Sequence, residues 1–295
     1  MKYISVTEFA AKYGISERTA RNYCSLGKIE GATLVGKTWN IPAEAELPGR
    51  KPRQRKAMPL LVVLRQEKEA KLKGGIYHKT QIDLTYNSNH IEGSRLTHDQ
   101  TRYIFETNTL GVTHESMNVD DIVETSNHFR CIDLVIENAT GMLTEGFIKE
   151  LHRILKNGTS DSRQSWFAVG DYKKLPNEVG GRDSTLPEDV AAEMKALLAD
   201  YNAAKEKTFE EILDFHYRFE RIHPFQDGNG RTGRLLVNLE LMKAGYPPID
   251  IKFTDRKRYY DAFDTYYVKK DLSAMTKLFA EYINARLDEY LKILN

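Results

Sequence analysis

The residues best suited to chemistry lie in one run from His223 to Arg234, which reads His-Pro-Phe-Gln-Asp-Gly-Asn-Gly-Arg-Thr-Gly-Arg. The run combines a proton acceptor, a carboxylate, a glycine-rich turn and two arginines. Leucines at helical spacing follow it and predict a helix from Leu235 to Ala244. The turn therefore precedes a helix N-terminus, where unpaired N–H groups and the positive end of the dipole bind phosphate. Its glycines let the backbone adopt positive φ and approach an anion closely.

Each charged residue of the run has a chemical use beside a bound phosphate. Arg231 and Arg234 are neighbours on a helix surface, and both can contact a polyphosphate. Asp227 can hold Mg²⁺, which takes one or two carboxylates together with phosphate oxygens. The imidazole of His223 titrates near neutrality and can remove a proton from a hydroxyl. An ordinary turn with solvated arginines is the alternative, but it leaves the combination of residue types unexplained.

At every fixed position the run matches the pattern His-x-Phe-x-Asp/Glu-Gly-Asn-Gly-Arg-x-x-Arg of the Fic family, which the chain resembles over roughly residues 75–290. The resemblance implies an enzyme that transfers AMP from ATP to a Ser, Thr or Tyr hydroxyl of a target protein, or of the chain itself, and releases pyrophosphate. It implies His223 as the general base and Asp227 as the Mg²⁺ ligand. It also implies that Gly228, Asn229 and Gly230 form an anion hole for the α- and β-phosphates. Arg231 and Arg234 would bind the β/γ end of the nucleotide.

A second motif, Ser-Asn-His-Ile-Glu-Gly at residues 88–93, resembles the inhibitory pattern Ser/Thr-x-x-x-Glu-Gly/Asn of the same family. In a short helix near residues 86–93, Ser88 and Glu92 face the same side, and Gly93 can end the helix. The resemblance implies that Glu92 pairs with Arg234, so that the γ-phosphate loses its partner and ATP binds unproductively. The motif precedes the loop, as in the subclass whose inhibitory helix is N-terminal to the core. An exposed acidic residue on a helix is the alternative.

A third segment, Gly170–Gly181, has glycine at both ends with proline and asparagine inside, which is typical of a loop or irregular hairpin. It resembles the family's flap, which aligns the target by adding a strand. Pro176 lacks an N–H, which disfavours regular strand pairing there. Tyr172, Lys173 and Lys174 are its candidate target contacts. The two lysines would favour acidic target segments, or they are a solvated charge pair.

Three tyrosines follow the loop helix. Tyr259 and Tyr260 resemble the aromatic pair that lines the adenine pocket in the family, and Tyr267 falls near a polar adenine contact of relatives. Because all three lie on an expected helix, packing in the core is the alternative for them.

The N-terminal residues predict a separate module. Ser5–Tyr13 and Ser16–Ser25 are expected to form two short capped helices, and residues 32–41 a hairpin. This order resembles the winged helix-turn-helix of the MerR/excisionase type, which implies DNA contacts from Arg18, Arg21 and Lys37. A protein-interaction module that kept the fold is the alternative.

Charge divides the chain in the same way. Residues 1–58 carry 11 Lys and Arg against 5 Asp and Glu, whereas the remainder carries 32 against 37. A basic head on a mildly acidic body is typical of a DNA-facing module attached to an enzyme. We therefore expect a winged helix-turn-helix at residues 1–48, a basic linker at 49–59 and a catalytic domain at 60–295.

Composition favours a cytoplasmic protein without membrane association. No apolar run approaches the roughly 20 residues that span a bilayer, and the first residues lack a signal peptide's apolar stretch. The two cysteines, Cys24 and Cys131, fall in separate predicted domains, where buried thiols are expected rather than a disulfide. The oligomeric state is left open, a homodimer included.

From residue 120 onward, apolar periodicity predicts helices at 120–137, 144–155, 187–201, 209–222, 231–244, 255–269 and 272–293. The expected fold is mainly α: a Fic-type helical core with a short β-hairpin flap, behind a small winged helix-turn-helix. Two other functions remain open on this fold. One is different chemistry on the same loop, either removal of AMP from modified protein or transfer of the γ-phosphoryl group. The other is a DNA-binding regulator whose core only senses nucleotide.

Overall fold

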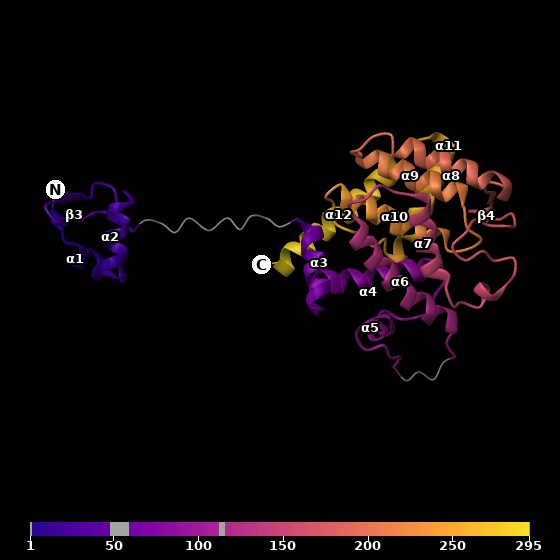
Figure 1. The fold of residues 1–295 in the computed structure, drawn as a ribbon, viewed down its shortest axis with the longest axis horizontal. Helices are drawn as coiled ribbons and strands as arrows, with labels where there is room; N and C mark the ends of the chain where they lie inside the picture. The colour runs from indigo at the N-terminus through magenta and orange to yellow at the C-terminus, as the bar shows by residue number, and fades with distance from the viewer. Residues whose placement is uncertain (1, 48–58, 112–115, 295) are drawn as a thin grey trace. The chain divides into compact units, whose positions relative to one another are not determined.

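The computed structural model describes residues 2–47, 59–111 and 116–294. The chain forms two compact units, Met1–Ala57 and Met58–Asn295, and Figure 1 labels their helices and two of their strands. Residues 49–58 of the expected basic linker lie outside the described residues.

The N-terminal unit consists of two helices and a small antiparallel sheet of strand order β1-β3-β2. Its elements are β1 (Tyr3–Ile4), α1 (Val6–Tyr13), α2 (Glu17–Ser25), β2 (Thr33–Val35) and β3 (Thr38–Pro42). Ser5 and Glu8 form a capping box at the start of α1, and the Ser16 side chain caps α2. Phe9, Ala20 and Ile41 are fully buried between these elements. The helices and the hairpin lie where the sequence predicts them.

The larger unit is mainly helical, which confirms the expected helical core. Its helices are α3 (Leu60–Ala70), α4 (Ile76–Ile91), α5 (His98–Thr107), α6 (Val119–Asn138), α7 (Glu145–Lys156), α8 (Pro187–Tyr201), α9 (Phe209–Ile222), α10 (Asn229–Lys243), α11 (Arg256–Lys269) and α12 (Ser273–Leu294). Two 3₁₀ turns, η1 (Asp161–Arg163) and η2 (Phe253–Asp255), and a hairpin of β4 (Glu178–Val179) and β5 (Arg182–Asp183) complete the described part.

Helix α10 is the central element of this unit and packs against α4, α6, α7 and α9. Every residue from Arg231 to Met242 is buried, as expected of a helix with neighbours on all sides. The amide of Asn238 satisfies the backbone N–H and C=O of Ile249 and the C=O of Arg234. Because α10 is enclosed by other helices, the loop before it has a rigid support.

The sequence predicted a short separate helix for the inhibitory motif, but the structure shows no such helix. Ser88 belongs to the last turn of α4, which runs for 16 residues, and Glu92 directly follows that helix. Most of the buried positions of α4 are polar, including Gln81, Asp83 and Asn87. Apolar periodicity is therefore weak along α4, which is why the sequence did not reveal its full length.

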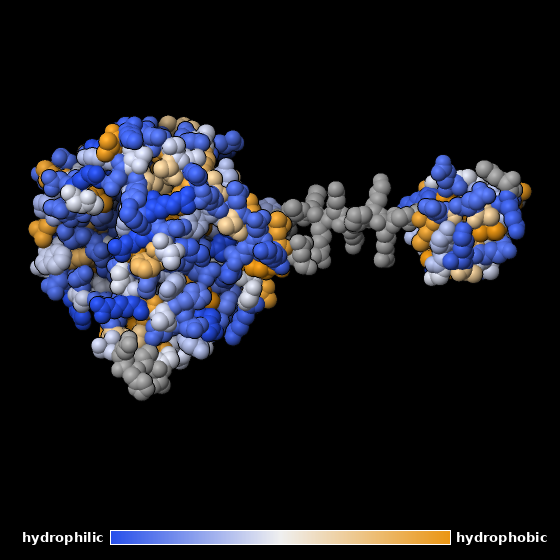
Figure 2. Space-filling view, turned by 180° about the vertical axis from the view of Figure 1, so that it is seen from behind, coloured by the Kyte–Doolittle hydropathy of each residue, from blue (hydrophilic) through white to orange (hydrophobic). Residues whose placement is uncertain are grey.

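Polar side chains cover most of the face of the larger unit in Figure 2, and apolar ones lie among them in small groups. In the three described ranges, none of the helices is both long and apolar enough to cross a membrane.

Candidate active site

The glycine-rich loop joins α9 to the N-terminus of α10. Gly228 has φ +80° and precedes the first residue of α10, and no side chain caps that helix end. The Asn229 side chain closes the loop from within: its Oδ1 accepts from Phe225 N at 2.8 Å and its Nδ2 donates to Phe225 O at 2.7 Å. The first amides of α10 thus lack a side-chain partner, as an anion site requires.

His223 ends α9 in the left-handed conformation, with φ +51°, and lines a cavity. Its Nδ1 lies 3.2 Å from the backbone oxygen of Glu220, which can only accept a hydrogen bond. Nδ1 therefore carries the proton, and Nε2 keeps its lone pair as a base. Burial lowers the pKa of His223 more than this hydrogen bond raises it.

Arg234 is held by the end of α4. Its Nη2 donates to Glu92 Oε1 at 2.6 Å and to Ser88 O at 3.0 Å, and its Nε donates to Ser88 Oγ at 3.0 Å. A side chain on Gly230 would place Cβ 2.4 Å from Glu92 Oε1, so only glycine leaves room for this ion pair. The structure thus brings Ser88, Glu92 and Arg234 together, while the inhibitory role of Glu92 stays a prediction.

Four charged side chains form a cluster beside the loop. Asp227 and Arg231 were expected there from the sequence, whereas Glu124 and Lys156 were not. Lys156 of α7 is buried, and its Nζ lies 2.6 Å from Asp227 Oδ2 and also contacts Glu124 of α6. Arg231 contacts Glu124 and lies 3.3 Å from the same Asp227 oxygen. Burial raises the pKa of Asp227, but the charges of Arg231 and Lys156 outweigh burial and hold it well below its usual range. No spacing in the chain links α6 or α7 to the loop, so no sequence signal marked Glu124 or Lys156.

The donor set around Asp227 fits a magnesium ion that arrives with phosphates. Among the residues that the structure describes, no group of three or more His, Cys, Asp or Glu could hold a metal by itself. Asp227 is an ionised oxygen ligand, and its side chain is 46% exposed. Mg²⁺ usually keeps its waters and adds one or two carboxylates and substrate phosphates, which matches one accessible carboxylate.

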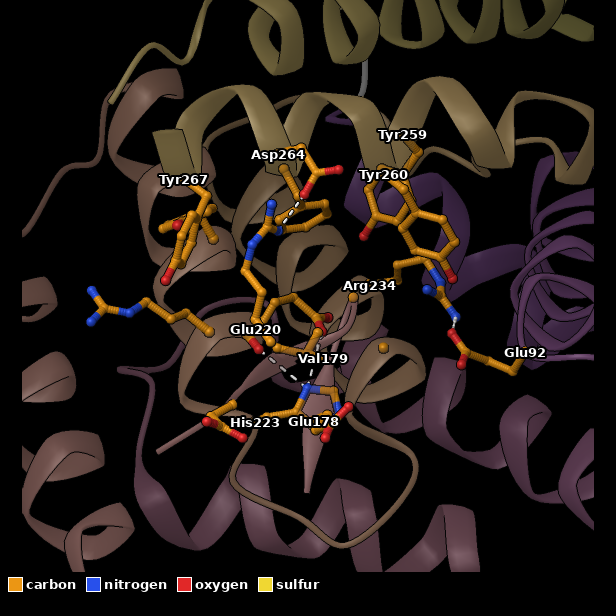
Figure 3. A pocket seen from close by; sticks show the side chains of 17 residues that line it. Glu92, Glu178, Val179, Glu220, His223, Arg234, Tyr259, Tyr260, Asp264 and Tyr267 are labelled. Carbon is orange, nitrogen blue, oxygen red and sulfur yellow. Dashed lines mark hydrogen bonds and ion pairs between the residues drawn. The ribbon is translucent and has the colours of Figure 1, made fainter. Parts of the chain in front are cut away.

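The cavity of about 430 Å³ beside this loop is shown in Figure 3. Its walls come from the β4–β5 hairpin, α9 and α11, together with Glu92, Gly230 and Arg234. Tyr259, Tyr260 and Tyr267 all line it, but Tyr259 is buried and its hydroxyl lies 2.7 Å from His216 Nε2. Asp227, Gly228, Asn229 and Arg231 do not line this cavity but lie beside it, in the loop and the first turn of α10.

The hairpin lies at the far end of the expected flap segment Gly170–Gly181. Its strands flank residues 180–181 and begin only after Pro176, which lacks the N–H that a strand pairing needs. The target contact predicted for Lys173 is wrong, because its side chain is buried and bound to the protein itself. Its Nζ donates to Asn177 Oδ1 and Ser184 Oγ, at 2.6 Å each. Lys173 therefore fixes the base of the hairpin.

The other two predicted flap residues also lie outside the strands. The Tyr172 ring packs against the main core, with Lys149 Nζ 4.0 Å from its centroid, and the tyrosine hydroxyl is buried. The residue as a whole is half-buried, so its contact with a target stays a prediction. Lys174 is exposed and lies near Ser165 O at 3.3 Å, so its role stays a prediction.

In the N-terminal unit, the three predicted DNA contacts are exposed. Arg18 and Arg21 lie on α2, and Lys37 lies in the turn between β2 and β3. Arg21 pairs with Glu17 one turn earlier at 2.8 Å, which leaves Arg18 and Lys37 as the less engaged cations of the three.

Proteins of known family are similar to this chain over the region that contains the site. Residues 142–241 match the model of the Fic/DOC family. A protein adenylyltransferase Fic of Nematostella vectensis is 31% identical over 180 residues, which are 60% of this chain and 41% of that protein. The protein of the same name from Aedes aegypti is 31% identical over 214 residues, 71% of this chain and 42% of its own length. The chain thus spans about two-fifths of the length of these curated relatives.

Solved structures resemble most of the chain. A Fic-domain-containing signaling protein of Bacteroides thetaiotaomicron is 30% identical with a TM-score of 0.60, covering 80% of this chain and 90% of that one. Fic-1 of C. elegans is 23% identical with a TM-score of 0.60, over 79% and 70% of the two chains, and shows the same fold.

Proposed function

This chain belongs to the Fic/DOC family, and we propose from that premise that it is a self-inhibited protein adenylyltransferase. It transfers AMP from ATP to a hydroxyl side chain of a protein and releases pyrophosphate. The main support is that His223, Gly230 and Arg234 line one cavity at the N-terminus of α10. A proton acceptor, an anion-binding helix end and a cation are the groups that nucleotidyl transfer requires.

The proposed reaction is an in-line displacement at the α-phosphorus. Nε2 of His223 accepts the proton of the target hydroxyl, whose oxygen forms a bond to the α-phosphorus. The bond from the α-phosphorus to the oxygen that bridges to the β-phosphate breaks, and pyrophosphate leaves with that electron pair. The first amides of α10 bind the charged phosphate oxygens, and Arg231 and Arg234 bind the leaving group. Catalysis then comes from positioning and charge.

Asp227 is the residue that would hold magnesium in this scheme. When bound, the ion neutralises charge on the leaving pyrophosphate. Lys156 and Arg231 keep the Asp227 carboxyl ionised, which is the form that binds a cation. Glu124 and Asp227 together balance those two cations, so the cluster stays close to neutral before the nucleotide arrives.

Self-inhibition in this proposal comes from competition for one guanidinium. Arg234 can bind the γ-phosphate only if it gives up its ion pair with Glu92, and both groups are mostly withdrawn from water. A charge-assisted bond of this kind is strong enough to compete with a phosphate. The Glu92 carboxylate also lies against Gly230, where it repels the triphosphate.

The position of label decides between this function and its alternatives. We expect purified protein carrying Glu92→Gly, incubated with cell lysate, to move label from the α-phosphorus of ATP onto protein, with a mass increase of AMP at a hydroxyl residue. Label from the γ-phosphorus on the target would instead show phosphoryl transfer. Loss of label from protein already carrying AMP, with no forward transfer, would show that removal is the reaction.

The pH profile tests the role of His223. Because its pKa is lowered, the unprotonated base persists to lower pH than in an ordinary histidine. We expect the acidic limb of kcat/KM, measured with the Glu92→Gly protein, to lie below the usual value of about 6.5. A limb above about 7 would contradict this environment for the base.

We further propose that the N-terminal unit is a winged helix-turn-helix that binds DNA through α2 and the β2–β3 turn. Its support is the order of elements and the exposure of Arg18, Arg21 and Lys37. Arginines on the second helix would contact bases or phosphates, and the lysine would contact the backbone.

Salt dependence of duplex binding measures this contact. Each phosphate contact adds about 0.9 to the slope of log K against log salt. We expect the full chain to bind duplex DNA in fluorescence anisotropy, and the variant with Arg18, Arg21 and Lys37 all changed to alanine to lose about 2–3 from the slope. Lys12→Ala, on α1, is the control. Weak binding of duplex DNA that the triple substitution leaves unchanged would exclude this DNA-binding surface.

A further inference from the structure

Three side chains on one face of α9 and at its C-terminal end line the cavity one after another. They are Tyr217, Glu220 and His223, each three residues after the one before, so successive residues are about 4.5 Å apart along the helix axis. Tyr217 lies at the end of the cavity that is lined by the aromatic side chains of α11, and its ring centroid is 6.0 Å from that of Phe263. His223 belongs to the phosphate end, beside the loop. Glu220 therefore lies between Tyr217 and His223 on this face, and Figure 3 shows it beside His223.

Glu220 is a buried carboxyl without a partner. The residue is 8% exposed, and its Oε1 has no hydrogen-bond partner among the residues that the structure describes. Its Oε2 lies 4.0 Å from His223 Nδ1, beyond hydrogen-bond distance. The nearby Arg234 makes its bonds to Glu92 and Ser88 instead. A buried acceptor that makes no hydrogen bond destabilises the protein unless a ligand binds to it.

The chain makes room for this carboxyl. A Cβ on Gly233 would lie 2.2 Å from Glu220 Oε1, so any larger residue would displace the carboxyl group. A Cβ at Gly233 would also lie 3.2 Å from Cε1 of His216, although the backbone of Gly233 has ordinary helical geometry inside α10. Glycine is unfavourable in a helix interior, and here the absence of a Cβ leaves space for the Glu220 carboxyl group between α9 and α10.

We propose that Glu220 binds a ribose hydroxyl of the nucleotide and makes the site selective for ribonucleotides. This inference rests on the proposed function, which places the α-phosphate near His223 and the base near the aromatic side chains of α11. The ribose links those two groups covalently, and Glu220 occupies the matching position between Tyr217 and His223. A hydroxyl both donates and accepts, so it can satisfy a buried carboxyl group.

The protonation of Glu220 agrees with a sugar contact beside a triphosphate. Burial raises the pKa of Glu220 to about 8, against the opposing charge of Arg234. At neutral pH the group is then mainly a neutral acid, which donates one hydrogen bond and accepts another. It therefore adds no negative charge next to the phosphates.

Binding to the full chain without turnover tests this inference. Calorimetry would compare ATP with its 2′-deoxy and 3′-deoxy analogues, for the wild type and for Glu220→Met, which removes the polar group at similar length. We expect the wild type to bind ATP about five- to tenfold more tightly than the analogue that lacks the contacted hydroxyl. Glu220→Met should bind all three within about twofold, because one lost hydrogen bond is worth about 1 kcal/mol.

Two further variants keep the test decisive if Glu220→Met does not fold. Glu220→Gln retains an acceptor and a donor, so the preference for ATP should persist. Gly233→Ala should displace the carboxyl group and reduce the preference. Glu210→Met, an exposed acid on the same helix, is the matched control and should change nothing.

Each outcome decides a separate point. Equal affinity of the wild type for all three nucleotides would overturn the inference, and so would an undiminished preference in Glu220→Met or Gly233→Ala. No binding of ATP at all would overturn the proposed function together with the inference. Binding with the expected preference but no AMP transfer would overturn the proposed function alone.

Discussion

We expect replacement of Glu92 with glycine to raise the rate of AMP transfer. Arg234 Nη2 donates a charge-assisted bond to Glu92 at 2.6 Å, and in the proposed mechanism this bond must break before Arg234 can bind the γ-phosphate. Such a bond is worth about 1.5–3 kcal/mol, and each 1.36 kcal/mol is tenfold in rate. We therefore expect the transfer of label from the α-phosphorus of ATP to protein to rise about 10- to 100-fold.

The remaining contacts explain why this substitution should release Arg234 without misplacing it. Ser88 still accepts hydrogen bonds from Nε and Nη2 of Arg234 through its side chain and its backbone oxygen. The guanidinium thus stays in position while it loses its competing anion. Glu92→Gln, which keeps an acceptor but removes the charge, should give an intermediate rate. If Glu92→Gly leaves a catalytically competent protein unchanged, the inhibitory assignment is wrong.

The loop could be predicted from the sequence because its groups are contiguous. A turn that begins a helix brings its own amides and the neighbouring side chains to one place, whatever the rest of the fold does. The surrounding helices α8 and α9 could also be predicted, because α8 begins with proline and each places apolar residues on one face. For both helices, the expected bounds agree with the observed ones.

The contacts between distant segments could not be predicted from local patterns. Lys156 lies in an apolar-faced helix and looks like a solvated C-terminal cation, yet it is buried against Asp227. Lys173 beside Lys174 looks like a surface charge pair, yet only the second is exposed. In each case burial is decided by partners that lie far away in the chain, and neither residue type nor spacing reports those partners.

Helix α4 shows a different limit. Its buried positions carry Thr80, Asn87 and Ser88, which bond to Tyr290, Asp250 and Arg234. Hydrophobic periodicity detects helices that bury apolar side chains, so a helix that is held by polar bonds escapes it. The family resemblance located the motif at its end, but only the structure shows that the motif belongs to so long a helix.

We expect replacement of His223 with alanine in the Glu92→Gly protein to remove nearly all AMP transfer. The substitution removes the base whose Nε2 lone pair is left free by the contact of Nδ1 with Glu220 O. General base catalysis contributes about 10²- to 10⁴-fold, so the labelled product should fall by that factor. Affinity for ATP should change little, because the helix end and Arg234 still bind the phosphates. Single-turnover transfer and calorimetry on the same preparation separate these two effects.

A histidine with a structural role provides the comparison. His152 is buried, its ring stacks on Phe225 at 3.9 Å, and its Nε2 lies 3.0 Å from Asp227 O, so it supports the loop from behind. We expect His152→Ala to lower thermal stability, and activity with it, whereas His223→Ala should abolish transfer while the melting temperature changes little. His223 is partly exposed to the cavity, and its loss removes fewer packing contacts. Transfer that persists in a folded His223→Ala protein would require another proton acceptor and would refute the proposed mechanism.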